Sequence, residues 1–152
     1  GIKNSSFNHI VTLDGDCQND PNDIPQLLMN YFNNEDCFLV SGIRINRKDS
    51  ISKIFASKMA NFVRSLILKD NCPDTGCSLK IFSKKIFLKF DQFDGIHRFL
   101  PAFFKKYGSK NIYIPVNHRY RKSGVSKYNN SKRLFKGIKD IIRVMKILNK
   151  TR

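Results

Sequence analysis

The sequence predicts an α/β layer fold, because apolar runs of strand length alternate with segments of helical periodicity along its 152 residues. A content of 41% hydrophobic residues, with 13 phenylalanines, is enough to build a folded core. No apolar run reaches the roughly 18 residues that a membrane-spanning helix requires. We therefore expect a folded domain whose printed sequence contains no membrane span.

The first predicted strand and helix follow one another closely. Residues 7–13 are mainly apolar and stop at Asp14 and Asp16, which predicts a buried strand. A helix then begins near residue 24, with Asp23 at the N-cap position and Pro25 in the first turn.

The middle of the chain repeats this alternation. The apolar run 37–40 predicts a second strand that Ser41 and Gly42 close, and residues 51–68 carry apolar side chains at helical spacing. After a loop at 71–76, we expect a strand at 79–82 and a short helix at 85–90.

The last third predicts a helix over 96–107 that Gly108 ends. Residues 112–116 predict a strand at the edge of the sheet, because Pro115 cannot donate to a neighbouring strand. A basic loop at 119–130 and a final helix at 131–149 complete the chain.

The charges divide the chain into an acidic start and a basic end. The net charge is +16, yet residues 1–43 hold six acidic residues against Lys3 alone, and residues 117–152 hold twelve basic residues against Asp140 alone. This pattern indicates a site for a cation first and a surface for an anionic partner last. The four cysteines have no zinc-site spacing and are expected to be free thiols.

Asp14 and Asp16 come directly after a predicted strand, one residue apart. Side chains alternate along an extended backbone, so both carboxylates would point the same way and repel each other unless a cation lay between them. Mg²⁺ and Mn²⁺ prefer such oxygen ligands and usually share them with substrate phosphates. The alternative is a polar turn at the end of a strand.

Five strings in order resemble family 2 glycosyltransferases of the dolichol-phosphate mannosyltransferase type. They are Asp14-Gly15-Asp16-Cys17-Gln18 followed by Asp20-Pro21 and Ile24-Pro25, Ser41-Gly42-Ile43-Arg44, Asp74-Thr75-Gly76-Cys77-Ser78-Leu79-Lys80, His97-Arg98-Phe99-Leu100-Pro101, and the basic segment from His118 to Tyr128. The resemblance implies that residues 1–130 are the C-terminal part of a GT-A catalytic domain, a Rossmann-like mixed sheet flanked by helices. It also implies that a nucleotide-binding half precedes them, so we expect these 152 residues alone to lack transferase activity.

The same resemblance implies a metal-dependent, inverting transfer of a sugar from a nucleotide-sugar donor to a polyprenyl phosphate. Asp14, Asp16 and Gln18 would bind Mg²⁺ or Mn²⁺ beside the donor diphosphate. Asp74 would position the acceptor or sugar, although a turn aspartate that caps Gly76 is an equal alternative.

Cations would bring the two anionic substrates together. The phosphate-binding candidates are Arg44, Arg121, Gly124, Ser126 and Lys127. Lys58 is the nearest match to a further cation of the family. A lysine at that place would offer phosphate a single point charge instead of the two parallel donors of an arginine. His97 and Arg98 lie where the family closes the sugar site, or else Arg98 forms a structural ion pair.

Residues 131–152 form a basic amphipathic segment. Its apolar stripe comprises Leu134, Ile138, Ile141, Met145 and Leu148, opposite Lys132, Lys136, Lys139, Arg143, Lys146 and Lys150. We expect this helix to lie at the cytoplasmic face of a membrane, as a peripheral contact. The alternative is an ordinary helix that packs its stripe on the core.

Two other functions compete with the transferase. A basic nucleic-acid-binding module fits the charge and the aromatic content, but it leaves the acidic start unexplained, and the chain lacks an RNA-binding or zinc-finger signature. An inactive remnant of a glycosyltransferase is the third reading. We favour the transferase, with no nucleic-acid partner.

Overall fold

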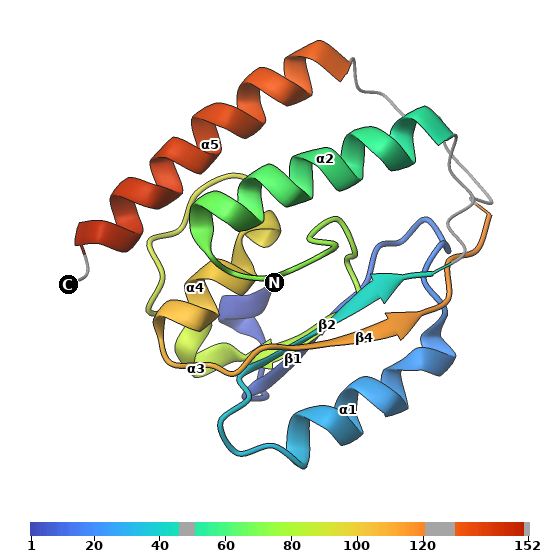
Figure 1. Cartoon of the computed structure of the whole chain (residues 1–152). Helices are drawn as coiled ribbons and strands as arrows, with labels where there is room; N and C mark the ends of the chain where they lie inside the picture. Colours follow the sequence, from blue (N-terminus) through green and yellow to red (C-terminus); the bar gives the residue numbers. More distant parts are fainter. Residues whose placement is uncertain (46–50, 121–129, 151–152) are drawn as a thin grey trace.

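A computed structural model describes residues 1–45, 51–120 and 130–150, with the side chains of the second and last α-helices described from residues 54 and 136 (Figure 1). Four strands form one sheet between helices, which confirms the predicted α/β class. The strands are β1 (His9–Thr12), β2 (Leu39–Arg44), β3 (Lys80–Ser83) and β4 (Ile112–Val116). The α-helices are α1 (Ile24–Phe32), α2 (Ile51–Leu68), α3 (Lys84–Phe87), α4 (Leu100–Lys106) and α5 (Asn130–Lys150), and the 3₁₀ turns are η1 (Ile2–Asn4), η2 (Pro21–Asp23) and η3 (Ile96–Arg98).

The sheet is mixed and has the strand order β1-β3-β2-β4. β3 runs antiparallel to both β1 and β2, whereas β2 and β4 are parallel. The C-terminal ends of β1, β2 and β4 therefore meet the N-terminal end of β3 at one end of the sheet. β4 lies at the edge, as its proline predicts.

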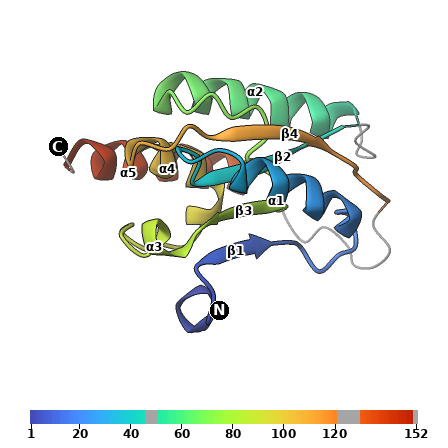
Figure 2. The same cartoon turned by 90° about the horizontal axis from the view of Figure 1, so that it is seen from below.

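Each face of the sheet has its own core, because successive side chains alternate between the faces. Val40 and Ile81 face α1, which covers one side. Leu39 and Phe82 face the opposite side, where α3, α4 and α5 enclose a core rich in phenylalanine (Figure 2). The loops at the end of the sheet thus leave strands that helices cover on both faces.

The prediction that Ser41 and Gly42 close the second strand is wrong. β2 runs through Ser41 and Gly42 to Arg44. A side chain at Gly42 would place its Cβ 2.7 Å from Val116 Cγ2, so glycine lets β4 lie close there. Asp23 occupies the N-cap position of α1 and Pro25 lies in the first turn, as predicted, but the Asp23 carboxylate makes no cap hydrogen bond and instead accepts from Asn117 N at 2.8 Å.

The predicted helix over 96–107 is divided in two. The turn η3 precedes α4, and Pro101 occupies the first turn of α4, where its missing N–H costs little. Gly108, with φ of +86°, follows the helix as predicted.

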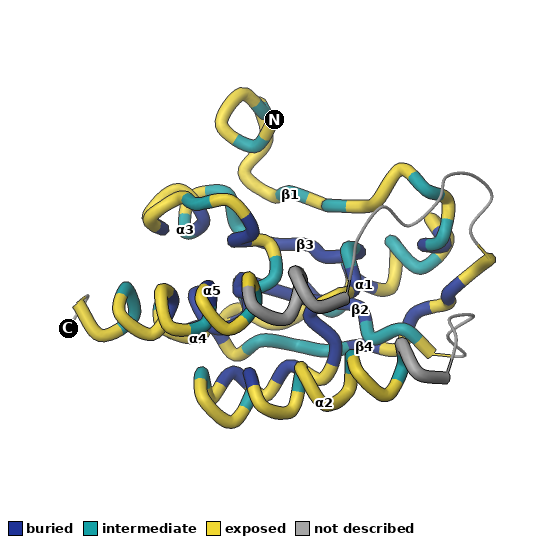
Figure 3. Tube along the Cα trace, turned by 90° about the horizontal axis from the view of Figure 1, so that it is seen from above, coloured by how far each residue is buried: buried dark blue, intermediate teal, exposed yellow. Residues whose placement is uncertain are grey.

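α5 packs part of its apolar surface on the core. Val144 is fully buried, and Ile141, Ile147 and Leu148 pack beside it. Ile138, Ile142 and Met145 remain exposed (Figure 3). The predicted stripe is thus shared between core and surface in the described part of α5. No helix in the described ranges is both long and apolar enough to span a bilayer.

The four cysteines differ in accessibility, which gives a direct test of the packing. Cys17 is exposed, whereas Cys37, Cys72 and Cys77 are buried. Burial raises the pKa of the Cys72 thiol to about 11 and also raises the pKa values of the other two buried thiols. Because the thiolate is the reactive form, we expect one thiol to react rapidly with a disulfide reagent and three to react only when the fold opens.

The measurement is the time course of thiol release in the native protein. The Cys17→Ser variant should lose the rapid phase and keep the three slow thiols. A second rapid thiol in the native wild-type protein would contradict this packing.

Candidate functional site

A small pocket lies where the strand ends converge. We call it the strand-end pocket, and its lining residues are Asp14, Asp16, Gln18, Asn19, Arg44, Gly76, Ser78 and His118. They come from four segments: the turn after β1, the end of β2, the loop before β3 and the residues after β4. The fold therefore brings the predicted carboxylates and Gln18 together with Arg44.

The turn after β1 is held by hydrogen bonds at both of its ends. Asp14 N donates to Ser78 Oγ at 3.2 Å, and Gln18 N donates to Asp16 Oδ1 at 3.2 Å. Cys17, which lies between Asp16 and Gln18, has φ of +63°, a left-handed conformation that turns the backbone sharply. Asp14 is exposed and Asp16 half-buried, so both carboxylates are accessible.

The oxygen donors of this turn fit a magnesium-type ion that is shared with phosphates. Mg²⁺ is usually bound by one or two carboxylates together with water and substrate phosphate oxygens. Asp14 and Asp16 supply two carboxylates, and Gln18 adds an amide. Within the described ranges, no three His, Cys, Asp or Glu side chains group as metal ligands. The donor set therefore suits a metal completed by substrate rather than one enclosed by protein.

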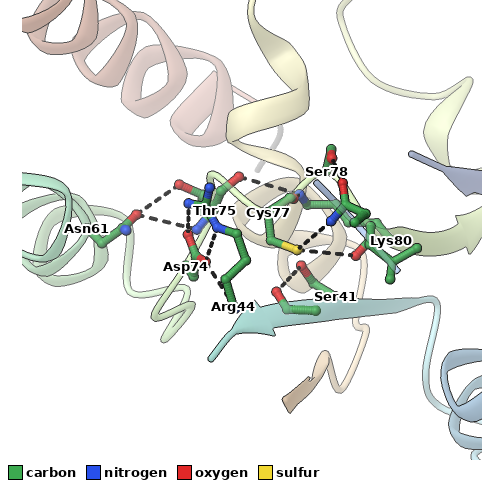
Figure 4. Close-up of polar contacts among 11 residues, drawn as sticks. Ser41, Arg44, Asn61, Asp74, Thr75, Cys77, Ser78 and Lys80 are labelled. Atoms are coloured by element: carbon green, nitrogen blue, oxygen red, sulfur yellow. Dashed lines mark hydrogen bonds and ion pairs between the residues drawn. The ribbon is translucent and has the colours of Figure 1, made fainter. Parts of the chain in front are cut away.

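Arg44 and Asp74 form a two-point ion pair at the wall of the pocket (Figure 4). Arg44 Nε donates to Asp74 Oδ2 and Nη2 donates to Oδ1, each at 2.8 Å, and Arg44 N also donates to Oδ2 at 3.2 Å. Their side chains are 15% and 7% exposed. A Cβ at Gly76 would lie 2.7 Å from Arg44 Nη2, so glycine leaves room for the pair. In these contacts Asp74 holds Arg44 in place.

The loop that carries Asp74 is anchored by contacts that the sequence analysis did not predict, two of them to Asn61 and Asn19. Thr75 Oγ1 donates to Asn61 Oδ1 of α2 at 2.9 Å (Figure 4). Ser78 Oγ donates to Asn19 Oδ1 at 2.6 Å. The buried Lys80 Nζ donates to the carbonyl of Cys77. The sequence does contain a signal for two of these anchoring residues: Asn61 and Lys80 are polar side chains within the mainly apolar segments of α2 and β3.

Comparison with known proteins now bears on these motifs. The chain is 38% identical over 148 residues to the dodecaprenyl-phosphate galacturonate synthase of Rhizobium johnstonii. It is 33% and 30% identical, over 131 and 128 residues, to the undecaprenyl-phosphate 4-deoxy-4-formamido-L-arabinose transferases of Klebsiella pneumoniae and Pectobacterium atrosepticum.

The alignments cover 95% of this chain for the first relative and 84% for the other two. The chain is homologous to the polyprenyl-phosphate glycosyltransferases. This confirms the resemblance that the five motifs indicate. The chain spans 43% of the first relative and 38% of each of the others, and no family model matches it.

Arg98 makes an ion pair in this polyprenyl-phosphate glycosyltransferase homologue. Its Nη2 lies 2.7 Å from Asp140 Oδ2, which ties η3 to α5. His97 next to it keeps an exposed face, and neighbouring atoms desolvate its imidazole and lower its pKa, as do the charges of Arg98 and Lys80. The negative charge of Asp14 offsets part of this lowering of the pKa, and His97 itself is not a lining residue of the strand-end pocket.

Lys58 is the one other predicted cation of the phosphate site that falls within the described residues; it is exposed on α2 and does not line the strand-end pocket. Arg121, Gly124, Ser126 and Lys127 lie outside the described residues. His118, which the sequence analysis named only as the start of the basic segment, is buried and lines the pocket.

The Arg44–Asp74 pair predicts a large loss of stability on truncation. Asp74→Ala would leave the guanidinium of Arg44 largely buried without its carboxylate, which costs about 3–5 kcal/mol in comparable pairs. We expect this decrease in the free energy of unfolding in urea titrations. Adding Arg44→Met should recover part of it, because no unpaired charge then remains.

Asp36→Ala is the matched control for that variant. Its carboxylate pairs with Lys110 on the surface, where the side chains are 67% and 81% exposed, so little change is expected. If Asp74→Ala and Asp36→Ala lower the free energy of unfolding equally, the Arg44–Asp74 pair does not stabilise the fold more than a surface pair does.

Proposed function

We propose that this chain forms the metal- and acceptor-binding part of a glycosyltransferase that moves a sugar, with inversion, from a nucleotide-sugar donor to a polyprenyl phosphate. The observation that carries the proposal is the meeting of Asp14, Asp16 and Gln18 with Arg44 in one pocket of a homologue of polyprenyl-phosphate glycosyltransferases. The three relatives act on dodecaprenyl or undecaprenyl phosphate, as their names state, and this supports the acceptor class.

Asp14 and Asp16 would hold Mg²⁺ or Mn²⁺ through their carboxylates, with the amide oxygen of Gln18 as a neutral donor. When bound, the ion would offset the negative charge that develops on the departing nucleoside diphosphate. The hydrogen bonds from Asp14 N to Ser78 and from Gln18 N to Asp16 hold the turn in shape before the ion arrives.

The acceptor phosphate needs cations more than it needs a base, because it is already ionised near neutral pH. Arg44 is a candidate contact: its pairing with Asp74 fixes the plane of its guanidinium at the pocket wall. Arg121 and Lys127 are the further cations that the sequence suggests for this phosphate. His97 and Arg98 would close the sugar side, with Arg98 anchored by Asp140.

A lipid acceptor is met at a membrane surface, and two neighbouring helices offer a suitable face (Figures 1 and 3). α2 contains no acidic residue and exposes a row of large apolar side chains: Phe55, Met59, Phe62, Val63, Leu66 and Ile67. The neighbouring helix α5 exposes Lys139, Lys146 and Lys150, while the guanidinium of its Arg143 lies 4.7 Å from the ring centroid of Phe93. Apolar side chains with adjacent cations are typical of peripheral binding to anionic bilayers, and we assign this face to the cytoplasmic leaflet.

The metal proposal predicts that the chain binds Mn²⁺ and that Asp16→Asn abolishes this binding. The measurement is the loss of the free-Mn²⁺ paramagnetic resonance signal on titration, with and without pyrophosphate. In the complete gene product, the same substitution should lower sugar transfer to undecaprenyl phosphate by roughly 100-fold or more. Asp36→Asn removes a carboxylate outside the strand-end pocket and should change neither result. Unchanged Mn²⁺ affinity in Asp16→Asn would refute the metal assignment.

The membrane proposal predicts co-sedimentation with anionic vesicles that weakens as salt is added, because surface charges are screened within about 10 Å at 0.1 M salt. Lys139→Glu with Lys146→Glu should weaken binding at least about tenfold, since each basic residue near the surface contributes on the order of 1 kcal/mol. Phe55→Ser with Phe62→Ser should remove the apolar contribution on neutral and anionic vesicles alike.

The matched control is Lys3→Glu with Lys85→Glu, which changes the net charge equally on exposed residues of η1 and α3. It should retain nearly all of the binding. If the two charge-reversed proteins bind equally, the α2–α5 face is not the face that meets the bilayer.

A further inference from the structure

Four aspartates follow one another between residues 14 and 23, and the structure uses them in two different ways. Asp14 and Asp16 line the strand-end pocket. Asp20 and Asp23 do not line it and instead bind the segment that follows β4. This second pair calls for an explanation, because a metal site requires only the first.

Asp20 is almost buried, with 9% of the residue exposed, and it has two partners. Its Oδ1 accepts from Asn22 N at 3.0 Å, and its Oδ2 forms an ion pair with Arg119 Nη2. The ion pair therefore tethers Arg119 to the turn that carries Asp20.

Arg119 in turn binds Gln18 at two points. Arg119 N donates to the Gln18 carbonyl at 2.8 Å, and Gln18 Nε2 lies 3.5 Å from the Arg119 carbonyl. An isolated antiparallel bridge between Asn19 and His118 extends the same contact. Residues 18–20 and 118–119 thus lie against each other as a short two-stranded clamp.

The clamp sets the direction of the Gln18 amide. Its nitrogen is turned toward the Arg119 carbonyl, so its oxygen is at the opposite end of the amide group. Gln18 lines the strand-end pocket together with Asp14 and Asp16. An amide oxygen that is already oriented toward a cation costs less conformational entropy on binding than one that must first be ordered.

We propose that Asp20, acting through Arg119, is a positioning residue for divalent metal in the strand-end pocket: the ion pair holds Gln18 so that its amide oxygen faces Asp14 and Asp16. The proposal rests on the proposed metal-binding function. Partners that orient metal ligands typically contribute 10- to 100-fold to metal affinity. We therefore expect the Mn²⁺ dissociation constant to rise by roughly 10- to 100-fold when the ion pair is broken.

The decisive variant is Arg119→Gln. If only long-range charge mattered, removing a positive charge near the pocket would tighten Mn²⁺ binding. Positioning predicts the opposite, a weaker binding. Asp20→Asn keeps an oxygen for the Asn22 N–H and should weaken Mn²⁺ binding to a similar degree. Asp23→Asn is the matched control: it removes the same charge from a residue that binds Asn117 rather than Arg119, and it should have a smaller effect.

The experiment measures Mn²⁺ affinity by paramagnetic resonance and thermal unfolding by circular dichroism on the same protein samples. In a Gln18→Ala background, Arg119→Gln and Asp20→Asn should have no further effect on affinity, because the residue they position is gone. A change in stability alone would not produce this non-additivity.

The outcomes separate this proposal from the one on which it rests. If the wild type binds Mn²⁺ and Asp16→Asn does not, the metal site stands. An Arg119→Gln affinity that then equals or exceeds that of the wild type overturns the positioning role. The positioning role is likewise refuted if Asp20→Asn and Arg119→Gln lower the Mn²⁺ affinity as much in the Gln18→Ala background as they do in the wild type. If the wild type binds no Mn²⁺, the metal site and its positioning residue both fall.

Discussion

The ion pair between Arg44 and Asp74 is the interaction on which the strand-end pocket depends. It joins the last residue of β2 to a loop 30 residues further along the chain. Both partners are largely buried, so their desolvation is costly and must be offset by good geometry. Two parallel hydrogen bonds provide that geometry, and Gly76 leaves the space for it. Once the loop is fixed in this way, Ser78 is presented to the turn after β1, where its hydroxyl oxygen accepts from Asp14 N.

A second buried cation supports the same loop from within the fold. Lys80 is 3% exposed and donates to carbonyls of the loop, and burial lowers its pKa. The negative charge of Asp74 acts in the opposite direction and raises the pKa of Lys80, whereas Arg44 lowers it further. Asp74 thus favours the charged form of Lys80 and forms the ion pair with Arg44. The same charge on Lys80 contributes to lowering the pKa of His97, so the electrostatics of the loop extend to the start of η3.

Periodicity and turn residues predict the order of the elements and the edge position of β4, because these depend on neighbours in the sequence. They do not predict which distant polar side chains become partners. Gln18 meets Arg119 across 101 residues, and Asp23 meets Asn117 across 94. Asp23 has the sequence context of an N-cap, but the competing backbone N–H of Asn117 takes its carboxylate. Ser41 and Gly42 have turn composition, yet close packing against β4 makes them part of a strand. In each case a tertiary contact overrides a local preference.

α2 connects the two halves of the proposed function, because its two sides have different tasks. Toward the protein, Asn61 accepts from Thr75 of the pocket loop, and Arg64 pairs with Asp70 and donates to the Cys72 carbonyl. Away from it, Phe55, Phe62 and Leu66 are exposed. A bilayer bound on the outer side would therefore be held by the same helix that anchors the loop of Arg44 and Asp74. Asn61 contacts the pocket loop, whereas Phe62, whose side chain is turned by about 100° around the helix, is exposed, so substitutions of the exposed residues can remove the lipid contact and leave the pocket intact. Docking and metal binding can thus be separated by experiment, although one helix serves both.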